Sequence, residues 1–509
     1  MQSVDKLLKR ANSAKRNKSL WEPHIRECYE YALPERNTID QWAKGSKKRN
    51  KVFDDTAPDA LEDFANRMTA MLVPSNTHWY MLEAGSDIPE SEVTKVNKYL
   101  EDTTKIIFEH INSSNFTSQV SEAMLDLGIS TGCLVCEEGD GIQSHLNFRA
   151  ISLSELCLER SDKGIVDTVF RFFKTRAVDI KELWPTAVLT ESLNKIQLES
   201  PDTEVDLIEG VVYDDGKYRS VLLYEKEKAL LIDTELDYNP YIVFRESTIA
   251  GEVYGRGRVM RQLNNIKTLN RMFEDYLKGL SFQANPIFTA TDDGVINPHS
   301  FKLAPGTVNA VGSNDRGNPT LNALQLSGNP QLMDHAVKGL QDTIRRALLS
   351  KPFGNVNETP VRTATEMSIR NADQMQTNLA ATSKVQSEFN ERVIANAVNI
   401  LKRAGKIAEF KVDGKEVKIK FINPATRQKD EAQLAAYGRF AEFVAASGLP
   451  MDVVAQKIKI EDLPVAIWDT LGLPEKGKRD EQEQAAMAQQ QQQMLAAQQA
   501  AMVPQGRPQ

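Results

Sequence analysis

The sequence predicts an α+β protein that is mainly helical. Apolar residues recur every three or four positions over most of the first 130 residues and again after residue 257, which is the period of an amphipathic helix. Between these regions, residues 132–245 contain short segments rich in Val, Phe, Tyr and Ile that are bounded by turn residues. Helices and strands that are segregated along the chain are typical of the α+β class.

The N-terminal region predicts five helices. Apolar spacing indicates one helix around residues 7–11, a second over 21–32 that Pro34 ends, and a third that starts at Asp54–Pro58 and ends before Pro74. Thr56 is the candidate cap of the third helix. Two more helices are expected over residues 89–111 and 116–127.

The following region predicts strands with one helical interruption near residues 177–184. Asp214-Asp215-Gly216 and Asn239-Pro240 supply turn signals between the segments. Residues up to about 250 therefore form one α+β domain. The expected strands cover residues 132–137, 146–152, 166–174, 211–213, 219–225 and 241–245.

The second half predicts long helices joined by small modules. A long helix precedes a turn-rich module at 284–330, and a return helix leads to a polar loop at 351–362. A helix over 363–403 would be about 60 Å long at ~1.5 Å per residue. A strand pair at 410–412 and 417–421 is expected around Asp413-Gly414. Helical pieces and a tail with 11 Gln and 7 Ala over residues 482–509 follow.

Composition and charge limit the class of protein. Hydrophobic residues make up 41% of the 509 residues and charged residues 26%, so the chain can bury a core, and its apolar runs are far shorter than the ~20 residues of a membrane span. We therefore expect a large cytoplasmic protein rather than a secreted, membrane or fibrous one. The net charge is −8, although residues 1–51 hold 13 basic and 6 acidic residues. This basic start is either a solvated helical arm or a docking element for a partner.

No metal or cofactor site is expected. Cys133 and Cys136 lie three apart in a predicted strand, where their side chains point to opposite faces, and no second ligand pair stands at zinc-site spacing. Buried, apolar cysteines are therefore the favoured interpretation. The six histidines are scattered along the sequence.

Enzyme motifs are also absent. Residues 472–479 imitate a phosphate loop, but Arg479 stands where Ser or Thr must bind magnesium and Pro474 disrupts the loop. Gly255 and Gly257 lack the third glycine of a dinucleotide fingerprint and are interpreted as a flexible helix entry. The Asp pairs at 54–55, 214–215 and 292–293 are interpreted as caps or turns. We expect a protein that is not an enzyme.

The order helix, compact module, return helix, loop and long helix predicts a hairpin stalk. Such a stalk has little core of its own, so neighbouring subunits must cover its apolar stripes. Head-to-tail contacts close into a ring when the rotation per subunit divides a full turn. The polar loop would then repeat around a central opening.

Several short stretches give the sequence a resemblance that covers nearly the whole chain. They are the Lys/Arg-rich start with Trp21 and residues 31–34, residues 53–57 (Phe-Asp-Asp-Thr-Ala), residues 71–74 with Trp79, residues 254–257 (Tyr-Gly-Arg-Gly) and residues 362–366 (Arg-Thr-Ala-Thr-Glu). In this order they resemble the head-to-tail connector, or portal, proteins of short-tailed bacteriophages.

The resemblance implies a portal-type fold in which an α/β wing, a two-helix stem, a small α/β clip, a long wing helix and a helical crown form one subunit of a ring, typically of twelve. Mapped on this sequence, the parts are the wing at 1–255, stem helices at 256–283 and 331–350, the clip at 284–330, the tunnel loop at 351–362, the long wing helix at 363–404, the crown at 405–475 and a tail at 476–509 that is disordered or forms a barrel helix.

The implied role is to occupy one capsid vertex, to nucleate head assembly, to dock the terminase packaging motor and later to bind tail or adaptor proteins. Capsid and scaffolding proteins are further expected partners, double-stranded DNA passes through the channel, and no membrane is involved. Assembly would take place in the host cytoplasm. A passive conduit should not adhere to phosphates, which agrees with a chain that is not basic overall.

The expected channel contacts lie in the tunnel loop: Lys351, Asn355, Asn357, Glu358 and Arg362. Lys338, Arg345 and Arg346 of the stem are second candidates, and salt bridges between subunits explain these three equally well. Two other classes of protein stay open on the residues alone. One is an elongated helical scaffold or internal virion protein without a channel, and the other is a nucleic-acid enzyme with dispersed carboxylates.

Overall fold

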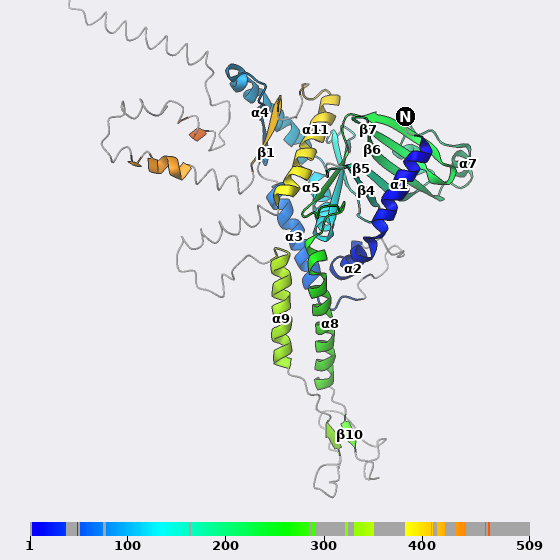
Figure 1. Ribbon diagram of the computed structural model, residues 1–509, viewed down its shortest axis with the longest axis vertical. Helices are drawn as coiled ribbons and strands as arrows, with labels where there is room; N and C mark the ends of the chain where they lie inside the picture. The colour runs from blue at the N-terminus through cyan, green and yellow to red at the C-terminus, as the bar shows by residue number, and fades with distance from the viewer. Residues whose placement is uncertain are drawn as a thin grey trace, which may run out of the picture. The chain divides into compact units, whose positions relative to one another are not determined.

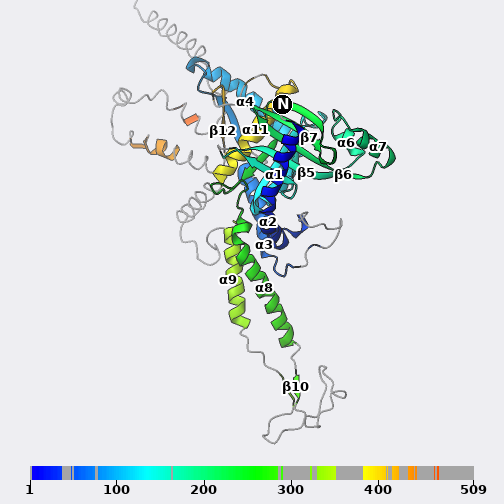
Figure 2. The same cartoon turned by 45° about the vertical axis from the view of Figure 1, so that its right-hand side comes forward.

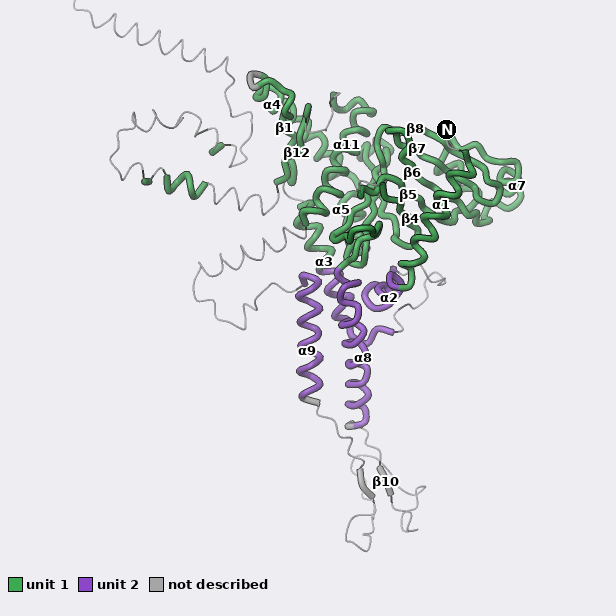
Figure 3. Tube along the Cα trace, viewed as in Figure 1, with its two compact units in different colours: residues 1–23, 64–257, 353–509 green, residues 24–63, 258–352 purple. Residues whose placement is uncertain are grey.

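The chain folds into two compact units, which Figure 3 colours separately. Unit 1 contains residues 1–23, 64–257 and 353–509, and unit 2 contains residues 24–63 and 258–352. The computed structural model describes residues 3–36, 48, 51–74, 78–161, 164–284, 288–290, 321–323, 330–350, 382–408, 410, 415–422, 434–440, 442–443, 464 and 467–468 (Figure 1).

The larger sheet of unit 1 is a five-stranded antiparallel meander. Neighbouring strands in the sheet are also neighbours in the sequence, so most connections are short. The connection between the second and third strand is longer and contains two helices. The turn between the third and fourth strand places Asp215 and Gly216 at φ of 48° and 85°, as a two-residue hairpin turn requires. The strands are β4 (Leu156–Arg160), β5 (Val166–Arg176), β6 (Glu204–Asp214), β7 (Lys217–Tyr224) and β8 (Ala229–Leu236).

Helices cover both faces of this sheet. Because successive strand residues point to opposite faces, Ile208 and Leu207 belong to two different cores. Helix α1 (Val4–Ser19) packs on the face of Ile208, whereas α6 (Asp179–Leu183) and α7 (Glu191–Glu199) pack on the face of Leu207. Figure 1 shows α1 lying across the strands.

The packing of α1 tests one of the two interpretations of the basic start, the solvated helical arm. Leu7, Leu8, Ala11 and Ala14 are buried against the sheet, so the segment is an integral helix and the expectation of a solvated arm is wrong. The predicted helix at 177–184 is confirmed as α6. The second helix of this insertion, α7, was not predicted.

A smaller antiparallel sheet of unit 1 has the order β3 (Leu146–Ala150), β2 (Thr131–Glu138) and β9 (Tyr241–Arg245). Cys133 and Cys136 of β2 are fully buried and carry free thiols, which confirms the apolar interpretation of the Cys-x-x-Cys pair. Burial also raises the pKa of both thiols, so neither is a reactive thiolate at neutral pH.

The helices next to this sheet match the prediction closely. Helix α5 (Phe116–Ile129) leads directly into β2, and α4 (Glu90–Asn112) lies beside β1 (Tyr80–Ala84). Strand β1, which the sequence did not predict, pairs antiparallel with β12 (Val417–Phe421). The strand at 417–421 is therefore confirmed, but its described partner is β1 rather than the expected 410–412 segment, whose described residue, Phe410, is not in a strand.

Unit 2 is built around two long helices that lie side by side in Figures 1 and 2. These are α8 (Arg258–Ala284) and α9 (Pro330–Ala347), which run in opposite directions. A hydrogen bond from the Arg258 guanidinium to the carbonyl of Ala347 (2.8 Å) accordingly joins the start of α8 to the end of α9. Between them in sequence, β10 (Phe288–Ala290) pairs with β11 (Leu321–Ala323).

Two N-terminal helices carry the chain between the units: α2 (Glu22–Ala32), followed by the short η1 (Pro34–Arg36), and α3 (Thr56–Leu72). Helices α2 and α3 confirm predicted ones, whereas η1 was not predicted. Among the described residues, no helix is both long and apolar enough to cross a membrane.

The predicted long helix is described from Thr382 onward and contains an irregularity. The π turn η3 (Gln386–Asn390) precedes α11 (Glu391–Arg403). Residues 351–381 lie outside the described residues. The predicted tunnel loop at 351–362 and the first half of this helix therefore stay predictions. The same holds for most of the proposed crown and the C-terminal tail.

Candidate functional site

The expected channel residues fall into two groups. Lys351, Asn355, Asn357, Glu358 and Arg362 all lie outside the described residues. The three stem candidates lie on α9: Lys338 is exposed and forms an ion pair with Asp334 one turn away (2.8 Å), Arg346 is exposed and donates to the carbonyl of Asp342, and Arg345 is half-buried. The Asp334 carboxylate raises the pKa of Lys338, which therefore stays charged.

The C-terminus of α9 is capped by hydrogen bonds just before the predicted tunnel loop. The amide of Ser350 donates to the carbonyl of Arg345 (2.8 Å) and that of Leu349 to Arg346 (3.2 Å), the hydrogen-bond pattern of a Schellman cap. Leu349 adopts φ of 59°, a conformation that glycine normally supplies, and its side chain is buried. The hydroxyl of Ser350 also donates to Asp63 near the end of the unit 2 part of α3.

The Tyr-Gly-Arg-Gly stretch and Trp21 come together in unit 1. The ring of Trp21 lies 5.7 Å from that of Tyr254, and the Arg256 guanidinium stacks over the indole at 5.0 Å. Two hydrogen bonds of 2.6 and 2.8 Å tie the same guanidinium to Glu252. The phenol of Tyr254 accepts from the amide of Leu158 and donates to a neighbouring carbonyl, which joins the stretch to β4.

The two glycines of this stretch pass close to the junction of α5 and β2. A Cβ on Gly257 would lie 2.3 Å from the carbonyl oxygens of Gly128 and Ile129, and one on Gly255 would lie 2.6 Å from the Ser130 carbonyl. Hydrogen bonds fix this approach, because Gly255 accepts from the Ser130 hydroxyl (2.7 Å) and donates to the Thr131 hydroxyl (2.9 Å). The interpretation of the pair as a flexible helix entry is therefore wrong: the glycines permit close backbone packing.

The Phe-Asp-Asp-Thr-Ala stretch organises unit 2. The side chain of Asp54 accepts from the amide of Thr56, so Asp54 caps α3 and Thr56, the expected cap, is the first helical residue. The second carboxylate oxygen of Asp54 accepts from Gln341 of α9 (2.7 Å). The side chain of Asn270 of α8 accepts a hydrogen bond from the backbone amide of Phe53 (2.7 Å) and donates one to the carbonyl of Lys51 (2.7 Å). One stretch thus connects α3, α8 and α9.

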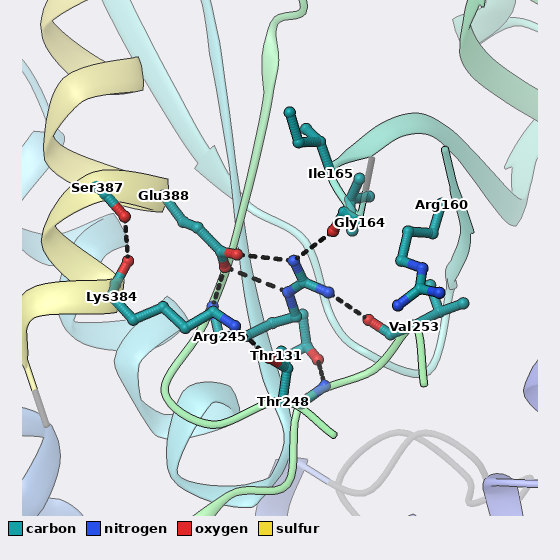
Figure 4. A network of polar contacts seen from close by, with 12 residues as sticks. Thr131, Arg160, Gly164, Ile165, Arg245, Thr248, Val253, Lys384, Ser387 and Glu388 are labelled. Atoms are coloured by element: carbon teal, nitrogen blue, oxygen red, sulfur yellow. Dashed lines mark hydrogen bonds and ion pairs between the residues drawn. The ribbon is translucent and has the colours of Figure 1, made fainter. Parts of the chain in front are cut away.

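A buried ion pair attaches the π turn to the smaller sheet of unit 1 (Figure 4). The guanidinium of Arg245, at the end of β9, donates to both carboxylate oxygens of Glu388, at distances of 2.7 and 3.2 Å. The backbone amide of Arg245 also donates to the Glu388 carboxylate (2.9 Å). Carbonyls of Val253 and Gly164 accept the remaining donors. The two side chains are only 4% and 17% exposed, so the pair is largely removed from solvent.

The residues that follow Glu388 continue this attachment. Phe389 is fully buried, stacks on Phe116 and lies 4.8 Å from the ring of Phe244, and the amide of Asn390 donates to the carbonyl of Leu72 (2.8 Å). The three residues that make these contacts, Glu388 to Asn390, all belong to the π turn. Single π turns within helices often occur at functional positions.

The decisive observation is a family comparison. The model of the family described as bacteriophage head to tail connecting protein matches residues 4–477. The chain belongs to this family. The connector is therefore a structural protein of a phage virion that joins the head to the tail at the capsid vertex. A comparison with curated proteins finds no match.

The connector carries no group of three or more His, Cys, Asp or Glu side chains suited to a metal within the described residues. It does bring together His110 and His145, whose rings lie 5.3 Å apart and whose proximity the scattered sequence positions did not reveal. Burial and the neighbouring His145 lower the pKa of His110, and burial lowers that of His78, which packs edge-on against Phe108.

These two shifts predict a loss of stability in mild acid. The unfolded chain binds protons at histidine near pH ~6.5, whereas the folded connector binds them at a lower pH, so unfolding takes up protons as the pH falls. We expect the melting temperature to fall between pH 7.5 and 5.5, and His110→Gln to reduce that fall. Scanning calorimetry at the two pH values checks this. The exposed His335→Gln is the control, and an equal pH dependence in all three proteins would contradict the assignment.

Proposed function

We propose that this connector is one subunit of a closed ring at a single capsid vertex, and that the ring's central channel admits double-stranded DNA during packaging and releases it during ejection. The family match over residues 4–477 carries the proposal. In this role the ring docks the terminase motor first and tail or adaptor proteins later, and it contacts capsid and scaffolding proteins while the head assembles. Twelve subunits are typical of such rings.

The division of the chain into two units supports the assignment of different parts of the subunit to different roles. Unit 2 contains the antiparallel pair α8 and α9 with the β10–β11 ribbon between them, which suits a stem with a small clip at one end. In this assignment the wing comprises residues 1–255 with the helix 363–404, the stem 256–283 and 331–350, the clip 284–330 and the crown 405–475. Strand β12 belongs to the proposed crown range, although it pairs with β1.

The DNA contacts are assigned to the tunnel loop at 351–362, with Lys351, Asn355, Asn357, Glu358 and Arg362 facing the channel. The firm closure of α9 at Ser350 supports this assignment, because a loop that meets moving DNA needs a fixed base. The net charge of −8 suits a conduit that does not retain phosphates. The ion pair of Lys338 with Asp334 reduces the cation's availability to DNA and to a neighbouring subunit alike.

Electron microscopy tests the ring directly. Negatively stained images of the purified full-length chain at low and high salt are expected to show closed rings with a central opening. Monomers or filaments under every condition would contradict the proposal and would favour an elongated scaffold without a channel.

Deletion of residues 355–359 tests the tunnel loop. We expect rings of unchanged size, because the deletion removes none of the contacts described within either unit. We also expect impaired packaging or retention of DNA in an infection or in vitro packaging assay. A deletion that abolishes ring formation would contradict the placement of this loop in the channel.

A further inference from the structure

The five-stranded sheet of unit 1 carries helices of opposite charge on its two faces. Helix α1 has six basic residues and one acidic residue within residues 4–19. The layer on the other face, residues 177–203, has five acidic and two basic residues. Since the two layers are separated by the sheet, they cannot neutralise each other within one subunit.

The outer side of α1 keeps unpaired cations. Lys6, Lys9 and Arg16 are exposed and have no acidic partner among the described residues, whereas Arg10 is held by Glu159 (2.6 Å). Positions 6, 9 and 16 lie on one side of the helix, because they are three and seven residues apart. A hollow of about 1140 Å³ beside α1 is lined by these three side chains and other residues of the helix, together with Glu159, Glu225 and Lys228. Just beyond the helix, Leu20 is 80% exposed.

The opposite layer is acidic and also exposes apolar side chains. Glu182 and Glu191 have no basic partner among the described residues, and Glu227 receives a hydrogen bond from Ser192 of α7, which lowers the pKa of its carboxyl group and keeps it ionised. Four large apolar side chains of this layer are exposed: Val178, Leu183, Val188 and Leu198, with 40%, 57%, 73% and 85% of their surface accessible. Clustered exposed apolar residues with a charged surround are typical of protein contacts.

We infer that these two faces bind each other between adjacent copies of this chain, so that the basic α1 face of one subunit docks on the acidic α6–α7 face of the next. The inference rests on the proposed ring and names the surfaces that close it. A contact between two different faces is heterologous, and such contacts generate rings or filaments rather than closed two-fold dimers. Opposite charge also fixes the direction in which each subunit meets its neighbour.

Charge reversal tests the pairing. Lys6→Glu, Lys9→Glu and Arg16→Glu combined form one variant, and Glu182→Lys, Glu191→Lys and Glu199→Lys combined form the other. Each alone should raise the concentration for half-assembly on the order of tenfold or more, as like charges then face each other. An equimolar mixture of the two variants should recover assembly, because alternating copies place opposite charges at every contact, and the chain with all six changes should assemble like wild type. Mass photometry over a dilution series measures this.

Controls separate folding and partner effects from assembly. Each variant must retain the wild-type circular dichroism spectrum and melting temperature, and Lys95→Glu with Lys406→Glu, two exposed lysines outside both faces, should assemble normally. Rings that form normally with either reversed face would overturn the inference and leave the ring itself intact. Loss of assembly that the six-change chain does not restore would also overturn it. Normal rings that lose binding to a DNA duplex would instead assign the α1 face to nucleic acid.

If wild-type chains form no ring at all, the proposed function fails rather than the choice of faces. If they form rings, raising NaCl from 0.1 to 1 M should weaken wild-type assembly, because the Debye length falls from about 10 to 3 Å. An assembly that is indifferent to salt would contradict a contact based on these charges.

Discussion

A connector carrying Gly257→Ala is expected to be strongly destabilised. The added methyl group would lie 2.3 Å from the carbonyl oxygens of Gly128 and Ile129, and these are backbone atoms that cannot rotate away as a side chain would. Overpacking in a rigid site costs about 1–3 kcal/mol and more where the backbone must shift. We expect a cost above about 3 kcal/mol, since the amide of Gly257 must also give up its hydrogen bond to Ile129.

Soluble yield and the melting temperature measure this loss. Gly279→Ala is a matched control, because a Cβ at that exposed position of α8 meets nothing within 4 Å. There, alanine should stabilise the helix by about 0.5–1 kcal/mol. Wild-type stability in Gly257→Ala would show that the approach of this stretch to α5 and β2 is looser than the structure indicates.

Breaking the ion pair between Arg245 and Glu388 should be the second most damaging change. Arg245→Met leaves a carboxylate, and Glu388→Met leaves a guanidinium, in a site that is nearly closed to water. Removal of one partner of a buried pair costs about 3–5 kcal/mol. The double variant should be less destabilised than the sum of the two single variants, because no uncompensated charge remains.

Chemical denaturation of the four proteins gives the coupling energy of this cycle. Lys217→Met provides the comparison, since its ion pair with Glu235 lies in solvent, where ion pairs contribute little to stability. Additive effects at Arg245 and Glu388 would contradict the pairing. A selective loss of the helix after residue 382, detected by hydrogen exchange, would show that this pair holds the helix on unit 1.

Local patterns predicted most of the secondary structure. The helix predicted over about 257–283 is α8, and the described end of the helix predicted over 363–403 contains α11. The helices predicted over 89–111 and 116–127 are α4 and α5. The predicted strands lie in the two sheets of unit 1, which also contain β4 and β8, two strands that were not predicted. Periodicity succeeds here because each of these elements buries one continuous side.

Pairing between distant segments could not be predicted. Strand β1 has only five residues and ends at Ala84, whereas its partner β12 begins at Val417, so no local pattern links them. The same limit applies to Arg245 and Glu388 and to His110 and His145. The glycine pair was noticed, but only the structure shows which backbone atoms lie against it.

The candidate site was predicted less well than the fold. Four of the stretches that carried the family resemblance make structural contacts: Trp21 packs on residues 254–257, and residues 53–57 and residues 71–74 with Trp79 hold other elements together. The charged residues selected for the channel depend on how subunits surround the opening. A single chain's sequence contains no signal for that arrangement.

The pairing of β1 with β12 has a consequence for biosynthesis. Strand β1 ends at Ala84 and must wait for Phe421 to leave the ribosome, which takes roughly 15–70 s at ~5–20 residues per second. During this time the edge of β1 and the pocket for Phe389 stay open, whereas α8 and α9 are already made. A prematurely terminated chain therefore presents an unpaired strand edge, which favours aggregation. Unit 1 thus acquires its finished fold only after translation has passed Phe421.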